Sequence, residues 1–559
     1  MLARPQIRSS WAALLVALFL ASAGNVRLWS AVTSGPARLS APGLLAGFLV
    51  LLALFTVLLQ LLALPWIFKP IAVIGLLASS IASFAMLGYG VLIDASMIRN
   101  LVQTDAAEAG ELLTPRGLAC VLVLGLLPAA LLLWTEIRYR PVVPELKRRG
   151  LVLALSVGAA LCAGIPAWQE LSFTVREHHE LKLMVNPSSP IGAVVSYVHG
   201  ELHQVDAGIA PIALDATRPA RPAGTPRLIF VLVLGETARA DHFSLNGYAR
   251  DTNPELSARE VINFPDVTAC GTSTAEVLPR LFSGLSREDG AWGAVSEREN
   301  LLDVLQRVGV AVLWRENNSG CKGVCDRVPS EQVTGPPGSA RDDEVYDERL
   351  LVGLQDELDR QAGDVFIVLH QRGSHGPAYS QRSPPAFKRF LPECAAEDLQ
   401  LCPQELLINA YDNTIVYTDH VLGLLIDQLA ANGATSRVAM LYVSDHGESL
   451  GENGVYLHGF PDWLAPEAQT HVPMVFWASP GFYAQRGLPA AELEARSGRA
   501  YAHDCVFHTV LGAFGVRTEA YDASLDLFSG ATSEPAAPVR RNSSRPMPAK
   551  LRPLSGNSR

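Results

Sequence analysis

The sequence has no excess of basic residues. Its 559 residues include 45 lysines and arginines against 55 aspartates and glutamates, for a formal net charge of −10. Surfaces that bind nucleic acid are basic because they neutralise phosphates, so this balance argues against nucleic acid as the main partner. The glycine-rich patterns G-x-x-x-x-G-K-[ST] and G-x-G-x-x-G are also missing from strand-to-helix turns. Their absence argues against a nucleotide cofactor.

Charged residues of either sign are scarce as well. They make up 18% of the chain, against 49% hydrophobic residues, and the mean hydropathy is +0.20. This composition is too apolar for an ordinary soluble enzyme, and the excess lies before about residue 171. Five apolar segments there approach the length of about 20 residues that a membrane helix needs. They cover residues 11–28, 44–66, 71–93, 118–137 and 151–168. We therefore expect a five-helix membrane domain over residues 1–170.

The basic residues between these segments indicate how the chain is oriented. Arg4 and Arg8 precede the first segment, and five more fill the fourth loop: Arg138, Arg140, Lys147, Arg148 and Arg149. The positive-inside rule places the N-terminus in the cytoplasm and everything after Trp168 in the periplasm. Arg4 and Arg8, the apolar core of the first segment and then Ala21-Ser22-Ala23 within it also have the pattern of a cleavable signal peptide. Cleavage would leave the later residues on the same side.

Residues 171–226 form a connector. The first part has the pattern of an amphipathic helix, broken by Asn186-Pro187 and resumed over 191–198. Such helices either lie in the membrane interface or pack as a plain linker on the following domain. The Pro-rich stretch 219–226 predicts a hinge, and the composition of residues 531–559 predicts a disordered tail.

Cysteines are also few. Of eight, Cys120 and Cys162 lie in or beside the apolar segments. Among the six that follow, Cys321 with Cys325 and Cys394 with Cys402 each close a small loop. Small loops of this kind suit disulfides in an oxidising periplasm. The spacing is too irregular for the paired C-x-x-C motifs of a structural zinc site, so we favour disulfides.

Four short apolar runs in the later part of the chain predict strands. They cover residues 228–234, 365–369, 438–443 and 472–477, with amphipathic segments between them. Continuous apolar strands alternating with helices predict an α/β domain with a mainly parallel sheet, here over residues 227–530. Open sheets of this class carry their chemistry at the carboxyl ends of the strands.

Polar residues follow three of these runs directly. Glu236 comes after the first, His370 ends the second, and Asp445 and His446 come after the third. Carboxylate and imidazole groups are suitable ligands for zinc or manganese. We therefore expect Glu236, Asp445 and His446 to converge at one edge of the sheet.

A candidate nucleophile lies in Cys-Gly-Thr-Ser-Thr-Ala at 270–275. A helix is predicted to begin there, so Thr274 would lie near its N-terminus, where the helix dipole favours an alkoxide or a phosphate. The alternative is that these hydroxyl residues only cap the helix. His375 and His458 each stand next to glycine in predicted loops, which suits a ligand site, although most loop histidines are surface groups.

Several longer motifs follow one another along the chain. They are Gly235-Glu236-Thr237, Cys-Gly-Thr-Ser-Thr at 270–274, Trp-Arg-Glu-Asn-Asn-Ser-Gly-Cys-Lys-Gly at 314–323, His375-Gly376-Pro377, Asn-Ala-Tyr-Asp-Asn at 409–413, and the stretch 444–458. On these motifs the sequence resembles the lipid A phosphoethanolamine transferases, the group that includes the mobile colistin-resistance enzymes. The resemblance covers the chain from the apolar segments to about residue 530.

The resemblance implies an alkaline-phosphatase-like α/β fold with catalytic zinc, as one ion or two. It implies four zinc ligands, Glu236, Thr274, Asp445 and His446, with Thr274 as the nucleophile that becomes covalently modified. It also implies that Asn318, Lys322, His375 and His458 bind the phosphoethanolamine group or assist proton transfer. The implied donor is phosphatidylethanolamine and the implied acceptor is a lipid A phosphate, at the outer face of a bacterial inner membrane. The added amine would weaken the attraction of polymyxin-like cationic peptides.

The sequence departs from the family pattern at one position. Many relatives have a second cysteine in the nucleophile segment that pairs with the first, and here that position holds Arg280. Cys270 is therefore either free or paired with Cys505.

Four other functions are alternatives to lipid A modification. The acceptor could be another periplasmic glycan or a core sugar phosphate, since acceptor choice depends on loops. Phosphoglycerol transfer is a second alternative. A sulfatase activity is disfavoured, because the C/S-x-P-x-R context of the formylglycine residue is missing. A non-catalytic binding protein is disfavoured because every expected ligand is present as the right residue type.

Overall fold

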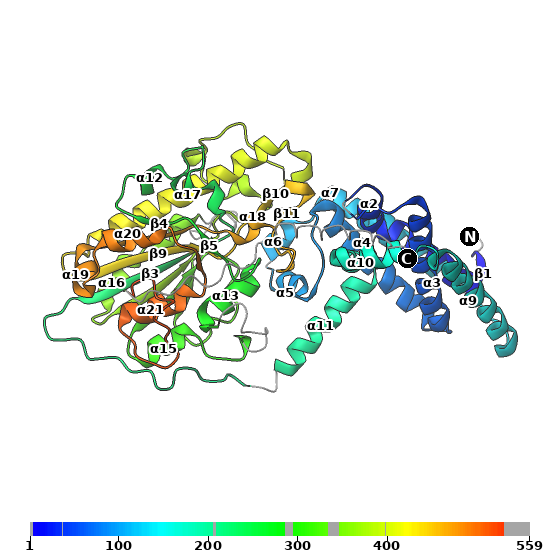
Figure 1. The fold of residues 1–559 in the computed structure, drawn as a ribbon, viewed down its shortest axis with the longest axis horizontal. Coiled ribbons are helices and arrows are strands. Elements are labelled where there is room, and N and C mark those ends of the chain that lie inside the picture. The colour runs from blue at the N-terminus through cyan, green and yellow to red at the C-terminus, as the bar shows by residue number, and fades with distance from the viewer. Residues whose placement is uncertain are drawn as a thin grey trace, which may run out of the picture.

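The computed structural model describes residues 4–35, 37–104, 106–204, 208–285, 295–333, 346–396 and 398–529. The tail predicted over residues 531–559 lies outside these ranges. The chain has two parts that lie side by side (Figure 1). A bundle of apolar helices, coloured blue to cyan, is formed by the first third, and an α/β domain is formed by the remainder.

The helical part contains four described helices that are long and apolar enough to cross a membrane, or five if one bent pair counts as a span. The four are Ser9–Ser34, Ala41–Leu62, Phe68–Gly88 and Pro115–Trp134, and the bent pair is Val142–Gly164 with Trp168–Glu177. In the labels of Figure 1, the first contains α1 (Ser9–Ala21) and α2 (Val26–Ser34), and the second and third are α3 (Ala41–Leu62) and α4 (Phe68–Gly88). The fourth contains α7 (Pro115–Val121) and α8 (Leu127–Trp134), and the pair is α9 (Val142–Gly164) and α10 (Trp168–Glu177), bent by 84°.

All five helices differ by some residues from the predicted segments, and the structure gives a physical reason for two of the differences. The third was expected to reach residue 93 but ends at Gly88, and Val91 and Leu92 are buried outside any helix. Gly90 adopts a φ of +74°, and a Cβ atom there would lie 2.6 Å from the carbonyl oxygen of Gly454. The apolar run continues past the helix because Val91 packs into a core of the α/β domain, whereas Leu92 packs among residues of the helical part. It is not needed to extend the span.

The fifth helix begins earlier than the predicted span. It starts at Val142 and includes the basic residues 147–149 that were assigned to a loop. Arg149 pairs with Glu145 one turn before it at 3.0 Å, which satisfies its charge within the helix. Basic residues therefore did not mark the helix boundary here.

The connector is partly helical and partly fixed to the α/β domain. Within it, α11 (Ser188–Gln204) runs out from the bundle (Figure 1). Two short helices that come earlier in the chain, α5 (Ala95–Gln103) and α6 (Ala106–Glu111), lie between the two parts. The residues before β3 (Arg227–Gly235) then follow the surface of the α/β domain. There Thr217 pairs with Arg517, and Arg218 forms an ion pair with the buried Asp364. The Pro-rich stretch 219–226, which was predicted to be a hinge, lies between these contacts and β3.

The α/β domain is built on a seven-stranded sheet of described residues in the order β4-β12-β9-β3-β8-β6-β7. The strands are β4 (Ile262–Phe264), β12 (Met474–Ala478), β9 (Ser436–Ser444), β3 (Arg227–Gly235), β8 (Val365–His370), β6 (Ala311–Glu316) and β7 (Ser330–Gln332). The five strands from β9 to β7 are mutually parallel, whereas β12 is antiparallel to both neighbours. The prediction of a mainly parallel sheet is confirmed, and the run at 472–477 supplies its one antiparallel central strand.

Helices cover both faces of this sheet (Figure 1). One face packs against α13 (Thr274–Ser283), α15 (Leu301–Arg307) and α21 (Cys505–Phe514), and the other against α16 (Leu354–Arg360) and α17 (Gln404–Ala430). Successive residues of β3 alternate between the two cores: Phe230 and Leu232 enter one, Val231 and Val233 the other. This double burial explains why the central strands are apolar at every position. The remaining short helices are α12 (Pro254–Ser257), α18 (Glu467–Thr470), α19 (Pro480–Arg486) and α20 (Ala490–Ser497).

Both predicted cysteine pairs are disulfide-bonded, Cys321 to Cys325 and Cys394 to Cys402. The remaining cysteines are free, and Cys270 and Cys505 are both buried. Of the two alternatives for Cys270, the structure has the free thiol.

Removing the disulfide bond between Cys394 and Cys402, which closes the longer of the two loops, tests its contribution to stability. Replacing Cys394 and Cys402 by alanine should lower the free energy of unfolding by about 2.5 kcal/mol, because the reduced chain regains the entropy of an open loop. Chemical denaturation of the detergent-solubilised protein measures this difference. Cys162→Ala, which removes an exposed free thiol from α9, is the control and should change nothing. Equal stability of the double variant and the control would contradict the expectation.

Candidate active site

Two adjacent strands deliver three ionisable side chains to one point at their carboxyl ends. In the register of the parallel pair β3 and β9, Gly235 lies opposite Ser444, so Glu236 and Asp445 leave the sheet side by side. His446 follows at once, and all three residues are buried. One ligand atom from each lies within 4.8 Å of the others. The sequence prediction that these three side chains converge is therefore confirmed by the structure.

The orientation of His446 leaves one ring nitrogen free to bind a cation. Its Nδ1 lies 2.9 Å from the carbonyl oxygen of Gly447, which can only accept, so this nitrogen carries the proton. Nε2 then presents a lone pair toward Asp445 Oδ2 at 3.3 Å and Glu236 Oε1 at 3.4 Å. Burial lowers the pKa of His446 to about 3, so the ring stays neutral.

The two carboxylate oxygens of Asp445 differ in their hydrogen bonding. Oδ1 accepts backbone N–H groups from Thr237 at 3.1 Å and from His446 at 2.7 Å. Oδ2 is buried and accepts no hydrogen bond from the residues that the structure describes. Burial, reinforced by the neighbouring charge of Glu236, raises the pKa of Asp445. A buried oxygen without a donor beside a second carboxylate is the environment that a bound cation would relieve.

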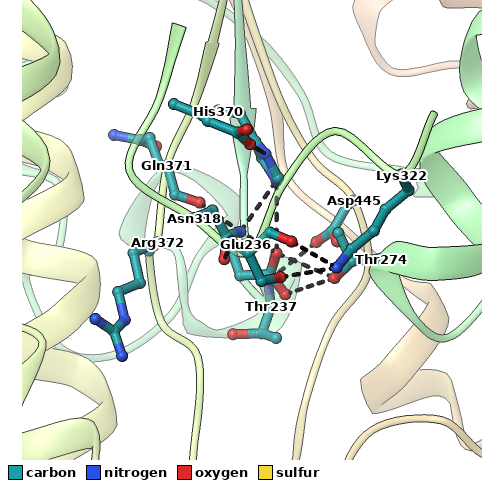
Figure 2. Close-up of polar contacts among 12 residues, drawn as sticks. Glu236, Thr237, Thr274, Asn318, Lys322, His370, Gln371, Arg372 and Asp445 are labelled. Carbon is teal, nitrogen blue, oxygen red and sulfur yellow. Dashed lines mark hydrogen bonds and ion pairs between the residues drawn. The ribbon is translucent and has the colours of Figure 1, made fainter. Parts of the chain in front are cut away.

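Thr274 occupies the first turn of α13 and points into this cluster (Figure 2). Its hydroxyl oxygen lies 3.0 and 3.1 Å from the two carboxylate oxygens of Glu236 and 3.3 Å from His446 Nε2. The hydroxyl of the preceding Ser273 makes no capping hydrogen bond. The threonine therefore contacts the acidic cluster, and helix capping does not account for its position.

The residues fit a zinc ion. Two carboxylates, one imidazole nitrogen with a free lone pair and one hydroxyl form a compact donor set of oxygen and nitrogen, which zinc accepts. The second group of potential ligands among the described residues is Cys321, Cys325 and Asp326, and its sulfurs are already joined in a disulfide. The described part of the chain thus offers one set of open metal ligands of this kind.

Asn318 and Lys322 approach the cluster from the segment after β6. The Asn318 amide donates to Glu236 Oε2 at 2.7 Å and lies 3.0 Å from His370 Nε2. The Lys322 ammonium donates to the Ser319 carbonyl at 2.9 Å and to the carbonyl of Gln103, in the helical part of the chain, at 3.1 Å. Figure 2 shows its side chain reaching toward Thr274.

His375 and His458 lie together on the other side. Their ring centroids are 5.1 Å apart, and the ring of His458 lies 4.5 Å from that of His446. His458 Nδ1 is 3.3 Å from a carboxylate oxygen of the fully buried Glu448. The structure thus brings His375 and His458 to the same place as His446, and neither histidine is a solvated surface group.

Comparison with known proteins agrees with this geometry. A family model described as sulfatase matches residues 229–516, and one described as phosphoethanolamine transferase EptA/EptB matches residues 51–202. The phosphoethanolamine transferase EptA of Salmonella typhimurium is 41% identical over 83% of this chain and 85% of its own. The chain belongs to the EptA family of phosphoethanolamine transferases.

Two further relatives extend this comparison to the whole molecule. The phosphatidylethanolamine transferase Mcr-1 of Escherichia coli is 38% identical over 81% of this chain and 85% of its own. The solved integral membrane lipooligosaccharide phosphoethanolamine transferase A of Neisseria meningitidis superposes with a TM-score of 0.89 at 34% identity, covering 94% of this chain and 99% of its own. The EptA-family fold therefore includes both the apolar helices and the α/β domain.

One histidine of this EptA-family site was noted only as the end of a strand. His370 ends β8, is completely buried, and lies 3.8 Å from Glu236 and 3.0 Å from Glu316 at the end of β6. Burial alone would lower its pKa, but hydrogen bonds with Glu236 and Glu316 and their charges raise it to about 9. Its place at a strand end was the signal that could have assigned it to the site.

Glu236 carries the opposite shift. Burial would raise its pKa, but the hydrogen bond with His370 and the charges of nearby histidines outweigh burial and lower it. Glu236 is therefore ionised at neutral pH. It is the anionic centre around which Thr274, Asn318 and His370 are arranged (Figure 2).

Residues from the helical part lie next to this site. Glu111 forms ion pairs with Arg382 at 2.6 Å and with Arg372 at 3.5 Å, and Arg382 in turn donates to the carbonyl of His375 at 2.8 Å. Together with the Lys322 contact to Gln103, these bonds join the segment around α5 and α6 to the loops of the site. These contacts hold the loops that carry His375 and Lys322 next to the helical part of the chain.

Proposed function

We propose that this protein transfers phosphoethanolamine from phosphatidylethanolamine to a phosphate of lipid A, with Thr274 as a covalent carrier. The observation that carries the proposal is the Thr274 hydroxyl, at hydrogen-bond distance from Glu236 and His446 at the end of a parallel sheet. The names of two relatives support the substrates. Mcr-1 is named a phosphatidylethanolamine transferase, and the Neisseria protein is named a lipooligosaccharide phosphoethanolamine transferase.

The first half-reaction forms a bond between the Thr274 oxygen and phosphorus and breaks the bond from phosphorus to the glycerol oxygen. When bound by Glu236, Thr274, Asp445 and His446, zinc would lower the pKa of the hydroxyl and offset charge on the phosphoryl oxygens. The Thr274 proton passes to water, and the oxygen of the departing diacylglycerol takes up a proton from His375 or His458, which regains one from water. Lys322 supplies a positive charge to the phosphoryl oxygens, and Asn318 holds Glu236 in place.

The second half-reaction transfers the group onward. A lipid A phosphate oxygen bonds to phosphorus, the bond to Thr274 breaks, and the threonine oxygen takes up a proton from water. Diacylglycerol leaves before the lipid A acceptor reacts, so ping-pong kinetics are expected. The pairing of His458 with Glu448 fixes the ring so that its second nitrogen faces the site.

The proposed location follows from the substrates and from the arrangement of the chain. Both lipids lie in membranes, and the contacts between Glu111 and Arg382 hold the catalytic loops next to the apolar helices. With the N-terminus in the cytoplasm, five crossings put the α/β domain in the periplasm, where disulfides form. The enzyme would therefore work at the outer face of the bacterial inner membrane.

Mass spectrometry of lipid A tests the acceptor. Cells that express the protein should carry lipid A with the added mass of one phosphoethanolamine group and should survive higher polymyxin concentrations. Cells expressing Thr274→Ala serve as the control and should carry unmodified lipid A. If lipid A is unmodified while another glycan gains the group, the acceptor assignment is wrong and the transfer chemistry stands.

A further inference from the structure

His503 is a buried histidine that has no part in the mechanism above. It follows β13 (Tyr501–Ala502), which pairs in parallel with β5 (Val267–Thr268), and its side chain is completely inaccessible to solvent. The backbone N–H of His503 donates to the carbonyl of Thr268 at 3.1 Å. The ring is therefore anchored beside the strand that leads directly into the nucleophile loop.

The two ring nitrogens bind two different catalytic segments. Nδ1 lies 3.3 Å from the backbone nitrogen of Cys270, which donates, and Nε2 lies 2.9 Å from the carbonyl oxygen of Ser444, which accepts. These partners require a neutral ring with its proton on Nε2. Burial lowers the pKa of His503 to about 4, which agrees with a ring that stays neutral.

The two partners stand at decisive positions in the chain. Cys270 begins the loop that ends at Thr274, and Ser444 is the last residue of β9 before Asp445 and His446. Cys270 forms no disulfide in this protein, so backbone hydrogen bonds hold the start of the loop, including that of Ala269 to Thr470 at 2.8 Å. The His503 ring connects the nucleophile loop to the strand that carries two metal ligands.

We propose that His503 is a positioning residue, which sets the separation between Thr274 and the Asp445–His446 pair by joining the Cys270 N–H to the Ser444 carbonyl. This inference rests on the proposed role of Thr274 as nucleophile. A loss of this bridge leaves all four metal ligands in the chain but lets the nucleophile loop shift against them. Small displacements of a reacting group are costly, since a shift of about 1 Å can lower a rate about a hundredfold.

Three substitutions separate the bridge from mere filling of space. His503→Gln keeps one acceptor and one donor on a side chain long enough to reach both partners. His503→Asn keeps an acceptor at the position of Nδ1, so it can still bind the Cys270 N–H, but its side chain is too short to reach the Ser444 carbonyl. His503→Leu fills the space and makes neither bond. The matched control is His508→Leu, which removes another buried histidine that accepts one backbone N–H, from Asp522 at 3.0 Å, on the neighbouring helix α21.

The test uses the full chain in detergent with phosphatidylethanolamine and lipid A as substrates. Relative to wild type, kcat should fall about a hundredfold in His503→Leu and about tenfold in His503→Asn, and stay within about threefold in His503→Gln. KM and bound zinc should remain within about twofold of wild type in all three variants. Hydrogen exchange of the Cys270 amide, followed by mass spectrometry, should accelerate in His503→Leu and stay slow in His503→Gln.

Several results would overturn the inference. They are a kcat unchanged in His503→Leu, an equal loss in the leucine and glutamine variants, or a loss in His508→Leu as large as in His503→Leu. If His503→Leu does not fold, the asparagine variant decides, and a wild-type kcat in that variant would overturn the inference. The exchange of the Cys270 amide needs no activity, so it separates failure of this bridge from failure of the proposed transfer reaction, which would appear as inactive wild-type protein.

Discussion

Thr274→Ala is expected to remove transfer almost completely, with a loss in kcat of about three orders of magnitude or more. In the proposed mechanism, the substitution deletes the atom that carries the phosphoethanolamine group. The described hydrogen bonds of the Thr274 hydroxyl are to Glu236 and His446 within the site. The variant should therefore insert, fold and bind zinc. Transfer to lipid A in detergent, measured by mass spectrometry, checks this expectation.

Two neighbouring variants control the experiment. Ser273→Ala changes the adjacent buried residue, whose side chain makes no capping bond, and should keep most of the activity. Thr274→Ser keeps a hydroxyl in place and should retain a measurable rate. Full activity of Thr274→Ala, or equal losses in the Ser273 and Thr274 variants, would contradict the nucleophile assignment.

Asp445→Asn is expected to change stability in opposite directions with and without zinc. In the metal-free protein, Glu236 and Asp445 are two buried acids side by side, and burial together with the charge of Glu236 raises the pKa of Asp445. Replacing one acid by a neutral amide removes this repulsion, so the metal-free variant should melt at a higher temperature than metal-free wild type. With zinc present, the order should reverse, because the variant has lost an anionic ligand.

Thermal unfolding of both proteins, after chelation and after zinc is restored, measures this crossing. Zinc affinity should fall by at least about a hundredfold in Asp445→Asn, and transfer should fall with it. The control is Asp427→Asn, which removes an exposed acid on α17 that pairs with Arg259, and it should change neither the melting temperatures nor the zinc affinity. A variant that zinc stabilises as much as wild type would show that Asp445 does not bind the metal.

The sequence predicted those parts of the site that follow directly from local patterns. Glu236, Asp445 and His446 could be placed because continuous apolar runs end just before them and parallel strands share one edge. An apolar run shows burial on both faces but not direction, so nothing in residues 472–477 indicated that β12 is antiparallel. The early end of the third membrane helix at Gly88 was also not visible in the sequence, because the apolar run continues into a buried loop and apolar character alone does not mark the end of a helix.

The contacts that organise the site were less visible in the sequence. His370 meets Glu236 and Glu316 only because β3, β8 and β6 are neighbours in the sheet, and the order of strands cannot be derived from three separate segments. His503 is 233 residues from Cys270 in the chain and has no local motif. The types of residue at the centre could be predicted, whereas the buried groups that hold them in place depend on tertiary structure.

The most direct test of the account is to trap the covalent intermediate. The full-length protein is incubated with zinc and phosphatidylethanolamine without any acceptor, digested with trypsin, and the peptide that contains Thr274 is fragmented in a mass spectrometer. The proposed mechanism predicts one phosphoethanolamine group on Thr274, which disappears when lipid A is added. Two results would contradict this mechanism. One is a phosphoethanolamine group on a different residue, and the other is formation of modified lipid A while no covalent group is detected on the protein.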